Sequence, residues 1–549
     1  MQLGTTQSNS RPLVWIGLAV GCGFLVAWLP VMASAGLIGG VALLLVVVLE
    51  PPLAVLLMLS LAPLKTLIAT EAPLPLPLDI GQLSFALVIA AWAVWRVTRQ
   101  RFTALPFTRL YWALAGIMLA FVPSLFGAES TTAWVSEILK WVEMGVLVLI
   151  VLDFGLPHHS ISSPSGMVGE PDLCRGGFAN PPWATLQSRP YKDLQGEFAN
   201  DISGVEKGSQ AFDASPTGRW QWIAFGVVLA AVLQALIGLY EYRGGSGAPH
   251  LWIDYVHFRA FGTFGQPNPF SAFMGLSLPL ALGLAWGYAW QAFAQWQMDH
   301  RWSAWLVSGM LALMYAGFGL LLLAGLLVAW GRGAWLGFGA AAVMMVFFAF
   351  RQRWIGVVLI TSGLVLGLAL WSAGLLPATI QLRIDNTLNE FIGFRDVRGV
   401  PISDDNFAIV ERLAHWQAAI NMMNDHPFSG VGLGNYETVY FDYSVPSWPR
   451  PLGHAHNDYL NVLAETGLIG LVGYLAGWIA IGWWTLRALQ QPDPVMRGMV
   501  LGLMGTWTHL AMHSVVDKLY VNNIFLHIGV MLGLLAVAFW HREYALVES

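Results

Sequence analysis

Long apolar segments recur along almost the whole chain, and they constrain its fold more than any other feature. A helix that spans a bilayer needs about 20 mostly apolar residues. Of the 549 residues, 56% are hydrophobic and only 11% are charged, whereas a soluble domain has about 25% charged residues. The sequence therefore predicts an all-α polytopic membrane protein with roughly 12–14 transmembrane helices. The candidate segments lie near 13–32, 35–49, 52–69, 82–97, 110–127, 132–152, 220–241, 269–291, 303–329, 333–350, 354–375, 458–486, 496–516 and 523–540.

Basic residues in the short connections predict the orientation, because Lys and Arg accumulate on the cytoplasmic side. The short connections contain four clusters of basic residues, and one arrangement of alternating spans places all four inside, together with both termini. It places 243–267, Gly331-Arg332, 376–457 and 517–522 outside. The clusters are Arg96, Arg99, Arg101 and Arg109, then Arg351 and Arg353, then Arg487 and Arg497, and finally Arg542.

The same reading divides the chain into five parts. Residues 1–152 and 220–375 carry the N-terminal and central helices, and 458–549 the C-terminal helices. Between them, 153–219 is a polar, Gly-, Ser- and Pro-rich insert expected to be a disordered cytoplasmic loop, and 376–457 is a large outside loop. The two cysteines, Cys22 and Cys174, are far apart and predict neither a disulfide framework nor a thiolate metal site.

The outside segment from His454 to Asp458 concentrates polar residues at the mouth of a helix. Such residues are costly at a membrane surface unless they are used or paired. A histidine can act as a general base at neutral pH, which makes His456 a catalytic candidate with His454 and Asn457 beside it. A helix start with polar interfacial residues explains the pattern equally well. A metal site formed by His454, His456 and His513 is a third reading, but no close carboxylate–histidine metalloenzyme motif accompanies it.

Two arginines, Arg259 and Arg332, lie on the outside, against the positive-inside trend. Guanidinium groups bind phosphate oxygens in bidentate fashion and stay charged. Together they suggest a phosphate site, although a boundary arginine that snorkels to the interface is common.

The outside loop is predicted to be partly helical. Residues Ala408 to Asn424 show an amphipathic pattern with Ile409, Leu413, Trp416 and Ile420 on one stripe, flanked by Arg412 and His415. The run Gly430-Val431-Gly432-Leu433-Gly434 follows, and it fits a turn that packs closely on a neighbour better than a phosphate cradle.

Two further sets of polar residues share a helix face. His509, His513 and Asp517 are spaced i, i+4, i+8, so they either face the same cavity as His456 or bond one another inside the bundle. Glu137, Lys140 and Glu143 are spaced i, i+3, i+6, for which an internal ion pair is the simplest account.

Several of these motifs together resemble the O-antigen ligase and polymerase superfamily of bacterial membrane glycosyltransferases. His456-Asn457, nine further residues and then Gly467-Leu468-Ile469-Gly470 resemble the His-[Asn/Ser/Gln]-x9-Gly-x-x-[Gly/Thr/Tyr] signature of the ligases. Arg412 to Tyr436, Gly331 to Trp335, and Gly262-Thr263-Phe264 with Pro267-Asn268 are also similar to the family. The resemblance covers about residues 220–530, and it extends to cyanobacterial relatives labelled bicarbonate transporters. The 153–219 insert departs from the family pattern.

The resemblance implies a membrane glycosyltransferase fold, similar to the GT-C type, in the bacterial inner membrane with a periplasmic loop at 376–457. Such enzymes move a glycan from undecaprenyl diphosphate to a hydroxyl of lipid A core, another glycan or a protein, without metal, other cofactor or nucleic acid. Carried over by position, His456 is the general base and Arg259 and Arg332 hold the diphosphate. Arg412 is a third phosphate contact or a scaffold of the loop, and His454, Asn457, His513 and Asp517 support the site.

Ligase, polymerase and protein O-glycosyltransferase stay open within that class. A secondary anion transporter, possibly for bicarbonate, is the alternative from another class. Transporters usually place polar residues near the middle of the membrane on broken helices, and here only Glu137, Lys140 and Glu143 fit that pattern. A structural scaffold for an export complex has no positive support.

Overall fold

The structure is a computed structural model that describes residues 50–71, 78–98, 105–156, 219–245, 251–253, 256–298, 300–376, 381, 396–403 and 406–548. The chain divides into one unit of residues 1–156 with 219–549 and a second unit of 157–218. All described residues belong to the first unit. The predicted spans 13–32 and 35–49 lie outside them, as do residues 157–218 of the predicted insert 153–219. The two ends of that insert are helical instead, because 153–155 continue the preceding helix and Arg219 begins the next one.

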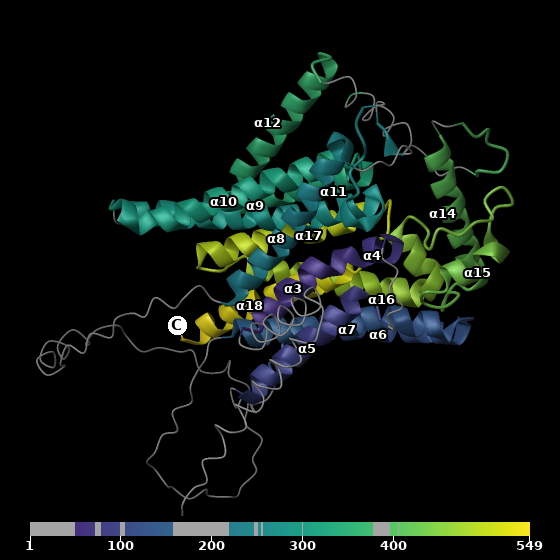
Figure 1. Ribbon diagram of the computed structural model, residues 1–549, viewed down its shortest axis with the longest axis horizontal. Coiled ribbons are helices and arrows are strands. Elements are labelled where there is room, and N and C mark those ends of the chain that lie inside the picture. The colour runs from purple at the N-terminus through teal and green to yellow at the C-terminus, as the bar shows by residue number, and fades with distance from the viewer. Residues whose placement is uncertain are drawn as a thin grey trace, which may run out of the picture. The chain divides into compact units, whose positions relative to one another are not determined.

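Helices form the secondary structure of the described residues, in which the only β contact is an isolated bridge between Trp252 and Phe258. Figure 1 shows them as long rods running side by side, with α14 and α15 at one end. The α-helices are α3 (Pro52–Leu61), α4 (Lys65–Glu71), α5 (Ile80–Thr98), α6 (Leu110–Phe121), α7 (Thr131–Gly155), α8 (Arg219–Tyr240), α9 (Pro267–Met298), α10 (Trp302–Val328), α11 (Arg332–Ala349), α12 (Arg353–Ser372), α14 (Phe407–Asp425), α15 (Tyr436–Tyr443), α16 (Asp458–Ala488), α17 (Pro494–His513) and α18 (Ile524–Glu548). Shorter turns are η1 (Ala62–Leu64), η2 (Val122–Gly127), η3 (Glu241–Gly245) and η5 (Gly262–Phe264).

Ten of these helical segments are long and apolar enough to cross a membrane. The chain is therefore an all-helical polytopic membrane protein, and each predicted span from 52 onward coincides with a helix. Helices α7 and α17, with 25 and 20 residues, fall outside this set of ten. In α7 the apolar run is interrupted by Glu137, Lys140 and Glu143, and the helix continues through Asp153 to Gly155.

Glycines allow the central helices to approach closely. A Cβ on Gly283 of α9 would lie 2.3 Å from the carbonyl oxygen of Gly498 on α17 and 2.6 Å from the nitrogen of Gly502. Small residues at such crossings favour helix association in a bilayer, because they bring the backbones into van der Waals contact. This contact fixes α17, which carries His509 and His513, against α9.

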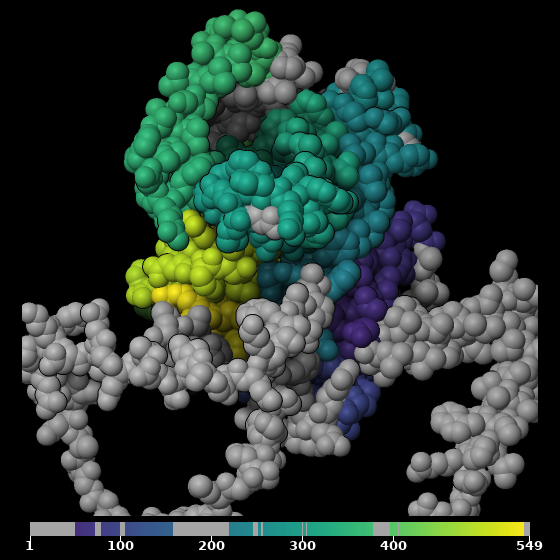
Figure 2. All heavy atoms as spheres, turned by 90° about the vertical axis from the view of Figure 1, so that its left-hand side faces the viewer, coloured from purple at the N-terminus to yellow at the C-terminus, as the bar shows by residue number. Residues whose placement is uncertain are grey.

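Helix α12 is the least buried of the spans. In its most apolar stretch 6% of the residues are buried, compared with 89% in α18. Figures 1 and 2 both show α12 (green) standing away from the α9–α10 pair (teal). Nearly all of its apolar surface is thus available to lipid.

Among residues 396–403 and 406–457, which we call the extramembrane segment, the helices are α14 and α15, and the predicted helix at 408–424 corresponds to α14. The apolar stripe seen in the sequence is not the most buried face of this helix. The fully buried face carries Val410, Ala414, Ala418 and Met422, whereas Ile409, Leu413, Trp416 and Ile420 are only partly buried. Small side chains at Ala414 and Ala418 let α14 approach its neighbours more closely than the larger side chains of the expected stripe would.

Helix ends from distant parts of the sequence meet at one end of the bundle. The N–H of Ala260 donates to Val328 O at 3.1 Å, and the N–H of Asp458 donates to Ser514 O at 2.8 Å. A Cβ on Gly333 would touch the His513 ring. We call this the site end, where α10 and α17 end and α11 and α16 begin.

Helix α16 is broken at Gly467. This residue has φ +63° and ψ −167°, in a region that L-residues with a side chain rarely adopt. Its Cβ position lies 2.3 Å from the carbonyl carbon of Phe428 and 2.6 Å from the nitrogen of Ser429. Because both contacts are to backbone, they leave no room for a side chain.

Replacing Gly467 with alanine should therefore destabilise the protein by about 2 kcal/mol or more, from backbone strain and the clash with Phe428. The measurement is the shift of thermal unfolding in detergent. Gly482→Ala is the matched control, because Gly482 lies in the same helix with no atom within 4 Å of its Cβ position. Equal stability of the two variants would contradict this account.

Candidate functional site

At the site end, the carboxylate of Asp517 lies between two imidazoles. Its Oδ1 is 3.6 Å from Nδ1 of His456 and 3.8 Å from Nε2 of His454. The three side chains are between 10% and 17% exposed. The two histidines precede α16 and Asp517 follows α17, so the structure brings together residues about 60 positions apart, as the orientation predicted.

The hydrogen bonds of His454 determine which of its nitrogens carries the proton. The N–H of His456 donates to Nδ1 of His454 at 3.1 Å. Burial lowers the pKa of His454 to about 3, the charges of His456 and Lys518 add to this, and Asp517 opposes it. The neutral ring therefore carries its proton on Nε2, which faces Asp517.

Local backbone structure holds His456 in place. It has φ +51°, an uncommon conformation for a residue other than glycine, although histidine adopts it more often than most. Asn457 follows as the N-cap of α16, and its side chain accepts the N–H of Leu460 at 3.0 Å. From α14, the indole N–H of Trp416 donates to His456 O at 3.4 Å. The turn before α16 thus presents the ring at a fixed position.

Positive charge around Asp517 keeps its carboxylate ionised. Burial alone would raise the pKa of this carboxyl, but contact with His456 and the charges of His454, His456 and Arg412 outweigh burial and hold the pKa below its ordinary value. Arg412 lies on α14 between Glu411 and Leu413. The structure thus brings Arg412 within electrostatic range of the His456–Asp517 pair.

The two predicted phosphate-binding arginines are both associated with the turn between α10 and α11. Arg259 donates from Nε to Ala329 O at 3.1 Å, just after α10 ends, and Arg332 is the first residue of α11. Gly333, next to Arg332, packs on the ring of His513. Both arginines therefore lie at the site end, and Gly333 connects the start of α11 to the end of α17.

His513 lies one helical turn behind Asp517. The N–H of Asp517 donates to His513 O at 3.1 Å, and Nδ1 of His513 is 3.3 Å from Nε2 of His509. Of the two readings of this helix face, the structure shows the internal contact between histidines for His509 and His513. Asp517 faces the site.

Comparison with protein families identifies this architecture. Residues 317–475 match the family model described as O-antigen ligase. This part of the chain is similar to the O-antigen ligase superfamily. The match contains α11, α12, α14, α15 and His456, whereas Arg259 and Asp517 lie outside it. Comparison with curated proteins gives no match.

The structure gives a physical reason for the O-antigen ligase signature. The asparagine after His456 caps α16, and Gly467 allows the break against Phe428. A Cβ on Gly470 would lie 1.9 Å from Oγ1 of Thr466 and 3.3 Å from the ring of Phe121. The signature therefore fixes the first turns of α16, which carry the histidine.

The glycine-rich run before α15 packs on this same region. Gly430, Gly432 and Gly434 have positive φ angles. The N–H groups of Val431 and Gly432 donate to carbonyl oxygens of α16, Ala464 O at 3.0 Å and Glu465 O at 2.9 Å. These amides are used in packing, which favours the close turn over the phosphate cradle.

A metal ion could bind here through different residues from those expected. His454, His456 and Asp517 each offer one ligand atom, and these atoms lie within 4.8 Å of one another. The third candidate ligand is thus Asp517 rather than His513. The proton on Nε2 of His454 points at Asp517, so metal binding would require a change of tautomer that breaks the bond from the N–H of His456.

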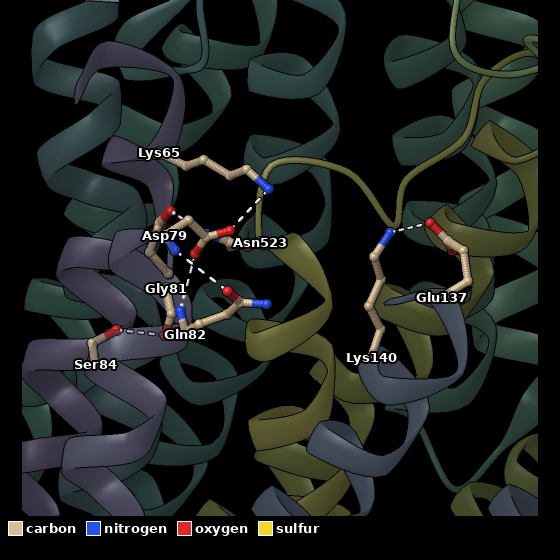
Figure 3. Close-up of polar contacts among 9 residues, drawn as sticks. Lys65, Asp79, Gly81, Gln82, Ser84, Glu137, Lys140 and Asn523 are labelled. Carbon is tan, nitrogen blue, oxygen red and sulfur yellow. Dashed lines mark hydrogen bonds and ion pairs between the residues drawn. The ribbon is translucent and has the colours of Figure 1, made fainter. Parts of the chain in front are cut away.

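Sequence reasoning singled out Glu137 and Lys140 but missed the charged side chains that join them behind the site. A cavity is lined by Glu137, Lys140, Asp458, Glu465 and Lys518, together with Asn461, Trp141, Tyr474 and Tyr520. The available signal was Asp458 and Glu465, two acidic residues in the first turns of the otherwise apolar helix α16. Such residues are costly in a membrane protein unless they are paired. The predicted pair is present: Lys140 contacts Glu137 (Figure 3), which leaves less reason to assign Lys140 to anion transport.

His415 should make stability depend on pH. Burial, with a smaller effect of His456, lowers its pKa to about 4, and the ring is 1% exposed. The unfolded chain takes up this proton near pH 6.5, so the stabilising contribution is complete above that pH and is lost as the pH falls toward 4. As the pH falls from 6.5 to 4, the free energy of unfolding of His415→Phe should therefore decrease less steeply than that of the wild type, by up to about 1 kcal/mol per pH unit.

Unfolding in detergent at several pH values measures this effect. His426→Phe is the control, because His426 lies exposed at the end of the same helix. An unchanged slope in His415→Phe would show that the ring is protonated in the folded state.

Proposed function

We propose that this protein transfers a glycan from a polyprenyl diphosphate, such as undecaprenyl diphosphate, to a hydroxyl acceptor at the outer face of the inner membrane. The O-antigen ligase match supports a glycosyltransferase-like enzyme. The observation that supports the finer proposal is the His456–Asp517 pair at the site end. Arg412 lies within electrostatic range of Asp517, and Arg259 and Arg332 lie at the same end of the bundle.

His456 is the proposed general base. A proton on Nδ1 directed at Asp517 leaves Nε2 with a lone pair that can accept the proton of the acceptor hydroxyl. The hydroxyl oxygen then forms a bond to the anomeric carbon of the donor, and the bond from that carbon to the diphosphate oxygen breaks. The proton ends on His456, and the electron pair of the broken bond leaves with the diphosphate.

The arginines stabilise the leaving group in this proposal. Negative charge develops on the diphosphate as it departs, and fixed guanidinium groups stabilise such charge without reorganisation. The close packing of Arg259 against the end of α10, with Arg332 at the start of α11, fixes the two main chains relative to each other. Arg412, on α14, adds positive charge within electrostatic range of Asp517.

The surroundings suit a lipid donor and a water-soluble acceptor group. The exposed apolar surface of α12 offers contact with lipid, and the 376–457 segment, which includes α14 and α15, serves as the periplasmic catalytic loop. The parts 1–152, 220–375 and 458–549 supply the membrane helices, with both termini in the cytoplasm. The acceptor distinguishes the three enzyme types. A ligase transfers the glycan to lipid A core, a polymerase to a second glycan, and a protein glycosyltransferase to a protein.

Removing the base should abolish transfer. His456→Ala is expected to lower the rate by about 100-fold or more, measured with purified protein, lipid-linked glycan and candidate acceptors. His426→Ala, which changes an exposed histidine of the same loop, should retain activity. Wild-type transfer by His456→Ala would remove the basis of the mechanism.

The arginines can be tested by keeping their charge and changing their shape. Arg259→Lys and Arg332→Lys should each reduce the transfer rate by about tenfold, because a point charge replaces a bidentate fork. Arg450→Lys serves as the control, since Arg450 is exposed in the extramembrane segment. If both lysine variants match the wild type, the arginines do not bind the diphosphate.

A further inference from the structure

Lys518 is the neighbour of Asp517 in the chain, but its side chain enters the interior of the bundle. Its side chain is 10% exposed, and Nζ lies 3.8 Å from Oε2 of Glu137. The other oxygen of Glu137 contacts Lys140, and both of these residues come from α7 (Figure 3). Lys518 thus ties the loop after α17 to a helix remote in sequence.

The charges around Lys518 compensate its burial. Removing an ammonium group from water costs several kcal/mol unless opposite charges replace the solvent. Glu137, Asp458 and Glu465 line the same cavity as Lys518. Burial would lower the pKa of the ammonium, but these three acidic side chains outweigh it and keep the pKa above its ordinary value. The lysine is therefore charged and held by electrostatic attraction.

Both partners of the His456–Asp517 pair are connected to this buried lysine. The N–H of Lys518 donates at 2.9 Å to Oδ1 of Asp517, the oxygen that faces the two histidines. Asp458, two residues after His456, has its N–H bonded to Ser514 O in the same loop. Its Oδ2 accepts a hydrogen bond from Tyr474 at 2.7 Å.

We propose that Lys518 is a positioning residue whose buried ammonium group locks Asp517 against His456. The role rests on the proposed glycosyl transfer and adds a residue to it. Lys518 touches no reacting atom. It acts through Asp517, because its side chain anchors the short turn that aims the carboxylate.

Lys140 offers a matched comparison. It contributes the same charge to the same cavity and pairs with the same carboxylate, but it lies on α7 and has no backbone connection to Asp517. If only the charge of the cavity mattered, Lys140→Met and Lys518→Met would behave alike.

A double-mutant cycle with Asp517→Asn distinguishes positioning from general stabilisation. Lys518→Met should lower kcat about tenfold with little change in KM, and Lys518→Arg should recover much of the loss. In the Asp517→Asn background, Lys518→Met should cause no further loss, because its effect passes through that carboxylate. Lys140→Met should cost less than twofold in kcat. Additive losses in the cycle, or equal losses for the two lysines, would overturn the proposal.

A structure of Lys518→Met by electron cryomicroscopy provides a readout that does not depend on activity. We expect Asp517 to move out of reach of His456, and an unchanged pair would overturn the proposal. If Lys518→Met does not accumulate, Lys518→Met/Glu137→Gln keeps the charge balance and takes its place in both measurements. A wild-type protein that transfers no glycan refutes the proposed function alone, because the structural comparison still tests the positioning.

Discussion

The candidate site depends on one buried carboxylate. Asp517 accepts from its own backbone neighbour and faces two imidazoles, so a single oxygen sets the direction of His454 and His456 together. A carboxylate in this position costs free energy to desolvate, and the cationic surroundings offset that cost. The location of Asp517 therefore has to be fixed by the packing of α17, which the glycine contacts with α9 provide.

The family signature and the fold have a common physical explanation. Asn457 caps the N-terminus of α16, and Gly467 bends the helix. The glycine-rich run before α15 donates hydrogen bonds to carbonyl groups in the first turns of α16. Each of these features constrains the same short stretch, which begins directly after His456. A sequence motif spread over more than thirty residues thus describes one rigid contact between α16 and the extramembrane segment.

Hydropathy was sufficient to predict the helices, because lipid requires every span to be long, apolar and internally hydrogen-bonded. The orientation rule also predicted that the turns carrying His456, Arg332 and Asp517 meet at one end. Other features depend on packing that no periodicity records. The buried face of α14 follows its small residues rather than its large apolar ones, and Lys518 escaped notice because a single lysine in a short loop gives no pattern. Its partners come from two separate stretches of the chain, in α7 and in α16, which only the folded arrangement brings together.

The break at Gly467 does not make the two parts of α16 independent, because contacts cross it. Just beyond the break, the N–H of Leu468 donates to Pro427 O at 2.8 Å, and farther along the helix the hydroxyl of Tyr474 donates to Oδ2 of Asp458 at 2.7 Å. Gly473 and Gly477 of the same stretch pack against α6. A displacement of α6 therefore reaches Asp458, two residues after His456, through contacts that bypass the bend. The chemical centre is mechanically coupled to a helix that contacts lipid.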